Sequence, residues 1–403
     1  MTTGSTGSLE TLRRLNRLRV IHTLREQGVT SRAEIARRTG LSRSTVSSLV
    51  ADLQADGLVV ERAEHGSARG TQGGRPPILL AFDASAGAAV GIAFGHRGLR
   101  VAVSDLSSTI LAQRHVDLDV DHEAQEGLDA AASLVTEALE EAEVTRDQVI
   151  GVGVGLPAPI HRATGIVGSS AILPGWVGVV AEEELRNRLG LPVLVDNDAN
   201  LGALAEAAYG AGRDAVDLLY LMVSSGIGAG LVLNGRLYRG ALGLAGEIGH
   251  VLMDAHGQVC RCGNRGCLET VASPQALLEL LRRSHGSLTT EEMLALARAG
   301  DPGCRRVLAD AGRALGNALA VLLNVLNPEV IVVGGELSAA GDLLLDGLRE
   351  TVGRAALPAS VEAAKVTCGT LGDRAEVLGA VALVVSEADS AFPTRLAVGA
   401  TGT

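Results

Sequence analysis

Three short β-rich runs open the part of the chain that decides its fold, residues 87–120, GAAVGIAFGHRGLRVAVSDLSSTILAQRHVDLDV. Glycine or serine separates the runs, as expected for strands joined by tight turns. Helical and strand patterns then alternate, with helices expected at 122–143, 180–189 and 200–209 and strands at 149–157 and 192–198. The order strand, strand, strand, helix, strand, helix, strand, helix indicates an α/β lobe.

The same order of elements returns after residue 215. A final helix is expected from about residue 374, and strands are expected at 218–225, 228–235, 236–240, 329–335 and near Val366. A long insertion interrupts this second copy. A duplicated unit predicts two α/β lobes, and ligands should bind in the cleft between them at the carboxyl ends of the strands.

Composition narrows the class of protein. The chain has 403 residues, of which 47% are hydrophobic and only 2% aromatic, so its core must be aliphatic. No apolar run reaches the roughly 20 residues that span a bilayer, and the N-terminus lacks the apolar stretch of an export signal. We therefore expect a soluble cytoplasmic protein with no membrane partner. Five cysteines without framework spacing make disulfides unexpected.

Charge is distributed unevenly along the chain. The net charge is −11, yet residues 1–80 hold 12 arginines, no lysine and 7 acidic residues, which gives about +5. The remainder holds 23 basic and 39 acidic residues, about −16. A small basic head on a large acidic body indicates that the head binds nucleic acid.

The basic head has the pattern of a helix-turn-helix. Ser31 followed by Glu34 fits a capping box at the start of one helix, Gly40 ends that helix, and Ser42 suits the N-cap of the next. An amphipathic helix within residues 12–28 completes a three-helix unit. The second helix of the motif has one apolar stripe, formed by Val46, Leu49, Val50 and Leu53.

The opposite face of that helix carries short polar groups and an arginine, which can enter a major groove. A two-stranded wing is expected over residues 57–83, with arginines at its tip. A small helical bundle that mediates protein contacts is the alternative. The expected DNA contacts are Arg32, Ser42, Arg43, Ser44, Thr45, Ser47 and, in the wing, Arg69 and Arg75.

Three of the five cysteines crowd into the eight-residue stretch CRCGNRGC. Cys260, Cys262 and Cys267 can supply three thiolates to one tetrahedral ion, and either His250 or His256 is near enough in sequence to be the fourth ligand. Thiolates combined with an imidazole favour zinc over magnesium or calcium. Unliganded thiols in a turn, or a redox pair, are the alternatives, although C-x-x-C spacing is absent.

Four segments resemble the signature segments of the ROK family of repressors, open reading frames and kinases. They are DNDANLGALAEAAYGAG (196–212), SSGIGAGLVLNGRLYRGALGLAGEIGH (224–250), CRCGNRGCLE (260–269) and VIVVGGEL (330–337). Together with the winged helix-turn-helix, the chain resembles ROK transcriptional regulators of the xylose- or N-acetylglucosamine-repressor type over nearly its whole length. The resemblance implies a two-lobed, actin-like (ribonuclease-H-like) ATPase fold for the body.

The resemblance also implies site residues. Family members hold a hexose with the residues that match Asn197, Asp198, Glu247, His250 and Glu269, and in the kinases the residue that matches Asp198 is the general base. His250 is selected as the fourth ligand, which makes a closed, structural zinc site that orients Glu269. The simpler interpretations are that Asn197 and Asp198 cap the next helix and that Glu247 is a surface carboxylate.

The chain departs from the kinase pattern in its first hairpin. ROK kinases carry D-x-G-G-T there, whereas this chain has Ala93, His96 and Arg97 in place of the aspartate, the second glycine and the threonine. The carboxylate linked to the metal and the tight-turn glycine are both missing, so we expect no ATP and no catalytic residue, with Asp198 as a vestigial base. Further departures are Ile172 for asparagine, Ala158 for glycine and Ser225 for threonine.

These observations predict a sugar-responsive repressor that is not an enzyme. A dimer or tetramer would bind double-stranded DNA at a palindromic operator and respond to a sugar or sugar phosphate. The alternatives are an ATP-dependent hexose kinase with a fused DNA-binding head, and a scaffold whose body binds another protein. The expected divisions are a head (1–63), a wing and linker (64–83), two lobes (84–212 and 213–388) and a disordered tail (389–403).

Overall fold

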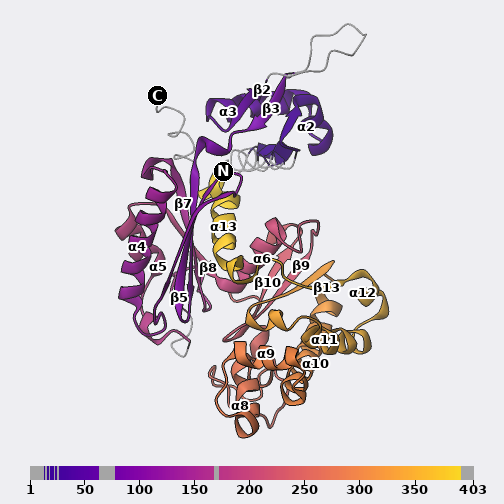
Figure 1. The fold of residues 1–403 in the computed structure, drawn as a ribbon. Helices are drawn as coiled ribbons and strands as arrows, with labels where there is room; N and C mark the ends of the chain where they lie inside the picture. Colours follow the sequence, from indigo (N-terminus) through magenta and orange to yellow (C-terminus); the bar gives the residue numbers. More distant parts are fainter. Residues whose placement is uncertain are drawn as a thin grey trace, which may run out of the picture.

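The computed structural model shows a small head above a two-lobed body (Figure 1). It describes residues 13, 16–17, 19–21, 23–24, 27–62, 78–167 and 172–391. Within these ranges, none of the helices combines the length and apolar composition that a bilayer span requires.

The head contains the predicted helix-turn-helix, formed by α2 (Arg32–Thr39) and α3 (Arg43–Ala55). The Ser31 and Ser42 hydroxyls accept hydrogen bonds from backbone N–H groups in the first turns of α2 and α3, so both predicted N-caps are confirmed. Gly40 ends α2 in the left-handed conformation, at φ 71°. The predicted capping box forms only in part. The Ser31 hydroxyl caps α2, but the carboxylate of Glu34 pairs with Arg37 and Arg38 in the next turn.

The wing is a three-stranded sheet in the order β1-β3-β2. Its strands are β1 (Val29–Ser31), β2 (Val59–Arg62) and β3 (Leu79–Phe82), all paired antiparallel. Residues 63–77 lie outside the described part of the chain, and the predicted DNA contacts Arg69 and Arg75 fall among them.

The first lobe is a five-stranded sheet in the order β6-β5-β4-β7-β8, with β4, β7 and β8 parallel and β5 and β6 antiparallel. α4 (Ala124–Glu141) and α5 (Ala181–Leu189) pack against this sheet. The strands are β4 (Ala88–Gly95), β5 (Gly98–Asp105), β6 (Ile110–Asp117), β7 (Val149–Leu156) and β8 (Val193–Asn197).

The second lobe repeats this topology in the order β11-β10-β9-β12-β13, so the predicted duplication is confirmed. The third strand, β11, is shorter than the predicted one. The strands are β9 (Leu218–Val223), β10 (Ile227–Leu233), β11 (Arg236–Leu237), β12 (Val330–Gly334) and β13 (Lys365–Cys368).

Helices and short 3₁₀ turns fill the connections. The insertion before β12 contains α7 (Glu269–Ala272), α8 (Pro274–His285), α9 (Thr290–Ala299) and α10 (Pro302–Leu326), and α11 (Asp342–Ala355) and α12 (Pro358–Ala363) follow β12. The 3₁₀ turns are η1 (Ala84–Ala86), η2 (Arg146–Gln148), η3 (Pro174–Trp176), η4 (Ile248–His250), η5 (Glu336–Ala340) and η6 (Gly372–Arg374).

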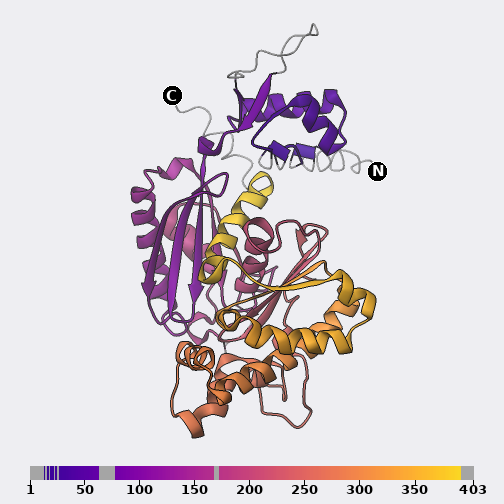
Figure 2. The same ribbon diagram turned by 45° about the vertical axis from the view of Figure 1, so that its right-hand side comes forward.

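The two lobes exchange their last helices (Figure 2). α6 (Asp198–Tyr209) follows β8 of the first lobe but packs on β9 and β10 of the second. α13 (Ala375–Ala391) follows β13 of the second lobe but packs on β4 and β7 of the first. α13 also takes in the first three residues of the predicted tail, while residues 392–403 lie outside the described part of the chain.

Glycines allow α6 and α13 to approach their neighbours closely. A Cβ atom on Gly379 of α13 would lie 1.9 Å from the Leu201 carbonyl oxygen of α6, and one on Gly153 of β7 would lie 2.0 Å from the Ala380 carbonyl oxygen. A side chain at Gly379 would therefore force α6 and α13 apart, and one at Gly153 would push α13 away from β7. The crossing of the two helices depends on Gly379, and the seating of α13 on the first sheet depends on Gly153.

A buried carboxylate ties the end of α6 to the segment that leads into α13. Glu206 is 1% exposed, and its carboxylate accepts hydrogen bonds from the backbone N–H groups of Ala211, Thr370 and Leu371 at 2.7, 2.9 and 3.1 Å. These hydrogen bonds from the backbone compensate for the burial of the side chain. Glu206 therefore links the end of one exchanged helix, α6, to the segment that leads into the other, α13.

The apolar core of the head continues into the body. Leu80 of the wing, Ala89 and Ile150 of the first sheet, and Val381 and Val384 of α13 belong to one apolar cluster with the helices of the head. The head therefore rests on the first lobe beside the far half of α13.

Replacing Gly379 with alanine tests the helix crossing. Gly379→Ala should lower the free energy of unfolding of the body by about 1–3 kcal/mol, because its methyl group overlaps the Leu201 carbonyl. Gly353→Ala in α11 is the matched control. No atom would lie within 4 Å of its Cβ, so the variant should gain up to about 1 kcal/mol of helix propensity. Thermal unfolding measures both, and a Gly379→Ala midpoint at or above that of the wild type would contradict the packing argument.

Candidate functional site

A cleft of about 860 Å³ lies between the two lobes. Its lining comes from the β4–β5 hairpin and the start of α6 in the first lobe, and from η4, α7, α9, η5 and the start of α13. Asn197, Asp198, Glu247, His250 and Glu269, the residues predicted to bind sugar, all line it.

Asn197 is the N-cap of α6, as the simpler interpretation predicted. Its Oδ1 accepts a hydrogen bond from the Ala199 N–H at 3.0 Å, and its Nδ2 donates one to the Ala158 carbonyl at 3.2 Å. The side chain therefore fixes the loop around Ala158 against α6 and has one N–H left for a ligand.

Asp198 is the first residue of α6 and faces the cleft. Burial, and then the negative charge of Glu376, raise the pKa of its carboxyl to about 8. Near neutral pH the carboxyl is mainly protonated, so it can both donate and accept hydrogen bonds. That combination matches a sugar hydroxyl, which also donates and accepts.

An ion pair missed by the sequence analysis joins the two lobes directly behind this position. Asp196, at the end of β8, accepts a hydrogen bond from Nε of Arg239 at 2.6 Å and from Nδ2 of Asn200 at 2.7 Å. The Asp196 side chain is only 8% exposed. In the sequence, Asp196 is the first acid of DND and Arg239 is the second arginine of RLYRG. Because they lie 43 positions apart, no local pattern indicates that they pair.

The predicted metal ligands form one group. The ligand atoms of His250, Cys260, Cys262 and Cys267 all lie within 4.8 Å of one another. His250 Nδ1 is 3.6 Å from Cys260 Sγ, and Cys262 Sγ is 3.7 Å from Cys267 Sγ. The edge of a tetrahedron with zinc–sulfur bonds of about 2.3 Å is about 3.7 Å, so the four donors fit a tetrahedral cation. His256, the other candidate, is not part of the group.

The thiols need a positive charge beside them to ionise together. Burial and the neighbouring thiols raise the pKa of Cys267 to about 12. A cation at the centre of the group would supply that charge, since metal-bound cysteines are deprotonated.

Two contacts connect this metal cluster to the cleft. His250 Nε2 lies 3.7 Å from a carboxylate oxygen of Glu247, which leaves Nδ1 facing the thiols. Arg261, between two of the cysteines, pairs through Nε with Glu269 at 2.7 Å, and Glu269 also accepts the Ile227 N–H. Arg261 was missed by the sequence analysis, although it stands between two predicted ligands.

The β4–β5 hairpin presents no carboxylate from its turn. His96 and Arg97 form the two-residue turn between the paired Gly95 and Gly98. His96 Nδ1 lies 2.7 Å from Asp121 Oδ1, which holds the ring in place. Arg97 is exposed in the cleft, and its side chain has no hydrogen-bonded or ion-paired partner among the described residues.

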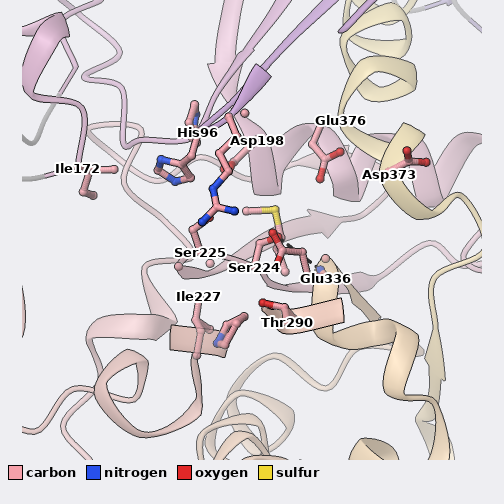
Figure 3. A pocket seen from close by; sticks show the side chains of 18 of the residues that line it. His96, Ile172, Asp198, Ser224, Ser225, Ile227, Thr290, Glu336, Asp373 and Glu376 are labelled. Atoms are coloured by element: carbon pink, nitrogen blue, oxygen red, sulfur yellow. Dashed lines mark hydrogen bonds between the residues drawn. The ribbon is translucent and has the colours of Figure 1, made fainter. Parts of the chain in front are cut away.

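The sequence analysis missed three acidic residues, Glu336, Asp373 and Glu376, which line the cleft on the side of Asp198 away from His96. Figure 3 shows Glu376 and Asp373 on one side of Asp198, with His96 and Ile172 on the other. Asp373 pairs with Arg100 at 2.6 Å, whereas no side chain in the described part of the chain forms a hydrogen bond or ion pair with the carboxyl groups of Glu376 and Glu336. Burial raises the pKa of Glu376 to about 7.

The head presents part of the predicted DNA-binding face. Arg43, Ser44 and Ser47 are exposed at the start of α3, as expected. Three other predicted contacts are already engaged within the head. Ser42 caps α3, and Arg32 donates a hydrogen bond to Gln54 at 3.1 Å and lies 3.6 Å from Glu61. Thr45 is half-buried and bonds to the Ser42 hydroxyl.

Comparison with known proteins matches both parts of the chain. The ROK family model matches residues 89–387, and the MarR family model matches residues 14–70. The xylose repressor of Caldicellulosiruptor bescii is 31% identical over 395 residues, covering 94% of this chain and 98% of that protein.

Solved structures agree over the same regions. A ROK family transcriptional regulator, described as a homolog of the Escherichia coli MLC protein, covers 96% of this chain and 99% of its own, with a TM-score of 0.80 and 26% identity. A ROK family glucokinase from Streptomyces griseus, in complex with glucose and AMPPNP, covers 74% of this chain and 99% of its own, with a TM-score of 0.65 and 29% identity.

The raised pKa of Asp198 predicts a pH dependence of stability. Its folded pKa of about 8 lies above the ordinary value of 3.8, so the stabilisation is present below about pH 4 and is lost as the pH rises through 8. Asp198→Asn removes this loss, and its thermal midpoint should exceed that of the wild type by more at about pH 8.5 than at about pH 5.5. Asp346→Asn, on the exposed face of α11, should show no such trend. An equal difference at both pH values for Asp198→Asn would contradict the prediction.

Proposed function

The chain belongs to the ROK family, and from that premise we propose that it is a sugar-responsive transcriptional repressor. The proposal rests on the combination of two features in one chain. A helix-turn-helix exposes Arg43, Ser44 and Ser47, and the body contains a cleft lined by carboxyl groups. Its relative from Caldicellulosiruptor bescii, similar over almost the whole chain, is named a xylose repressor.

The cleft supports sugar binding without phosphoryl transfer. The Streptomyces griseus glucokinase holds both glucose and a nucleotide analogue, so a body of this fold has room for two ligands. In this chain the hairpin turn has His96 and Arg97, and Ala93 supplies no carboxylate for a metal. The carboxylate of Glu336, and that of Glu376 when it is ionised, would repel a triphosphate.

A sugar kinase with a fused DNA-binding head is the second candidate, because a ROK family glucokinase has a similar body and Asp198, the residue that the family resemblance matches to the base, lines the cleft. It requires ATP consumption in the presence of glucose, xylose or N-acetylglucosamine. Turnover with any of these sugars would favour this candidate over a non-catalytic repressor.

The metal cluster is proposed to hold one structural Zn²⁺ through His250, Cys260, Cys262 and Cys267. Four protein ligands leave no open position, so the ion would cross-link the insertion rather than take part in a reaction. Arg261, fixed between two ligands, would then hold Glu269 at the edge of the cleft.

The head and the cleft are proposed to communicate through α13. Glu376 lies at the start of this helix in the cleft, and Val381 and Val384 belong to the apolar cluster beneath the head. In a dimer on a palindromic operator, sugar binding would change the placement of the two heads, with a coupling of about 1–3 kcal/mol. The division into head, linker, two lobes and tail stays a prediction.

Loss of Arg43 tests the DNA-binding face. Arg43→Ala should weaken binding to an operator by about 10- to 100-fold, because one arginine contact contributes about 1–3 kcal/mol. Arg354→Ala, on α11 in the second lobe, is the matched control and should bind normally. Gel shifts with DNA from carbohydrate operons provide the measurement. No specific binding by the wild type, with or without sugars, would contradict the proposed function.

Metal analysis tests the zinc site. The purified protein should contain one zinc per chain, and Cys262→Ser should lose it because three ligands hold the ion weakly. The variant should also unfold at a lower temperature and respond less to sugar, since Glu269 loses its support. Cys368→Ser, which alters a thiol outside the cluster, should keep the zinc. Full zinc content or a normal sugar response in Cys262→Ser would contradict the assignment.

A further inference from the structure

The cleft is larger than the residues predicted to bind a sugar would require. A volume of about 860 Å³ is in the range that encloses ligands of drug size, well beyond one sugar ring. Asp198, Glu247 and Glu269 occupy only part of the lining. The outer half of the cleft, defined by Arg97, Thr290, Glu336, Asp373 and Glu376, belongs to the same cavity.

The two halves are continuous. Figure 3 shows Glu376 reaching from α13 into the space beside Asp198, with Glu336 and Thr290 on the opposite wall. The charge of Glu376 contributes to the raised pKa of Asp198, so the two carboxyls are electrostatic neighbours. A ligand that contacts Asp198 can therefore extend toward Glu376 without leaving the cavity.

The outer half offers both acceptors and donors. Glu336 and Glu376 can accept hydrogen bonds and Arg97 can donate them, and none of the three is bonded to another side chain among the described residues. A sugar hydroxyl donates and accepts at once, so it can use both kinds of group.

A phosphate in the outer half would lack the same match. Phosphate oxygens near neutral pH mainly accept hydrogen bonds, and the carboxyl groups of Glu336, Asp373 and Glu376 line this half beside the guanidinium groups of Arg97 and the neighbouring Arg100. One of those guanidinium groups, on Arg100, is already paired with Asp373 at 2.6 Å. A neutral ligand is therefore favoured over a nucleotide or a sugar phosphate.

We infer that the effector is a neutral oligosaccharide of at least two rings. One ring would lie against Asp198, Glu247 and Glu269, and the next would lie in the outer half against Glu336 and Glu376. The inference rests on the proposed function and adds the class of effector. It assigns to Glu336 and Glu376 the recognition of the second ring.

Calorimetric titration of the full-length protein tests the inference. The probes are glucose, xylose and N-acetylglucosamine, the disaccharides cellobiose, maltose, xylobiose and chitobiose, and also glucose 6-phosphate and AMPPNP. At least one disaccharide should bind about 10-fold or more tightly than its own monosaccharide, equivalent to about 1.4 kcal/mol. If a monosaccharide, the sugar phosphate or the nucleotide binds as tightly as every disaccharide, the second-ring site is wrong while the proposed function stands. If no probe binds, both fail.

Variants of the outer half locate the second ring. Glu376→Ala should remove most of the advantage of the disaccharide, with the affinity for the monosaccharide retained. Glu336→Ala, on η5, gives an independent test should the change in α13 disturb folding. Glu350→Ala, an exposed carboxylate on α11, is the matched control and should bind both classes of sugar normally. A disaccharide advantage that survives both Glu376→Ala and Glu336→Ala would overturn the assignment.

Discussion

The crossing of α6 and α13 is the constraint on which the cleft depends. Gly379 lets α13 touch the Leu201 carbonyl of α6, and each helix is held on the sheet of the other lobe. Both helices begin in the cleft, α6 with Asp198 and α13 with Glu376 one position after its first residue. The distance between these two carboxyls is thus set by backbone packing between helices and not by flexible loops. A change in this distance therefore requires α6 and α13 to shift against each other.

The metal cluster supports the other wall of the cleft through short connections. Arg261 lies between two cysteines and pairs with Glu269, and His250 faces both the thiols and Glu247. Two of the proposed sugar ligands are therefore positioned by groups that belong to, or adjoin, the cluster. Contacts between side chains position Glu247 and Glu269 on one wall of the cleft. Close packing of the backbone positions α6 and α13 on the other wall.

Local patterns were sufficient to predict the duplicated fold, the caps of the head and the three cysteines of the metal cluster, because each depends on residues close in sequence or on a repeated order of elements. The choice of His250 over His256 came from the resemblance to the ROK family. Contacts between distant segments were not predictable. The ion pair of Asp196 with Arg239 requires the two lobes to be in place, and Glu376 reaches the cleft only because the helices are exchanged. The partners of Arg32 within the head, Gln54 and Glu61, were likewise not predictable from helical spacing, and its contact with DNA stays a prediction.

The exchange of helices also affects how the chain is made. The strands of the first lobe leave the ribosome early, yet the face of β4 and β7 stays uncovered until α13, the last helix, has been synthesised. The helices and wing of the head are synthesised first, whereas Val381 and Val384 of α13, which belong to the same apolar cluster, are synthesised late. A chain that terminates before α13 would therefore leave the face of β4 and β7 exposed and the cluster beneath the head incomplete. Incomplete chains with exposed apolar surface are targets for chaperones and proteases.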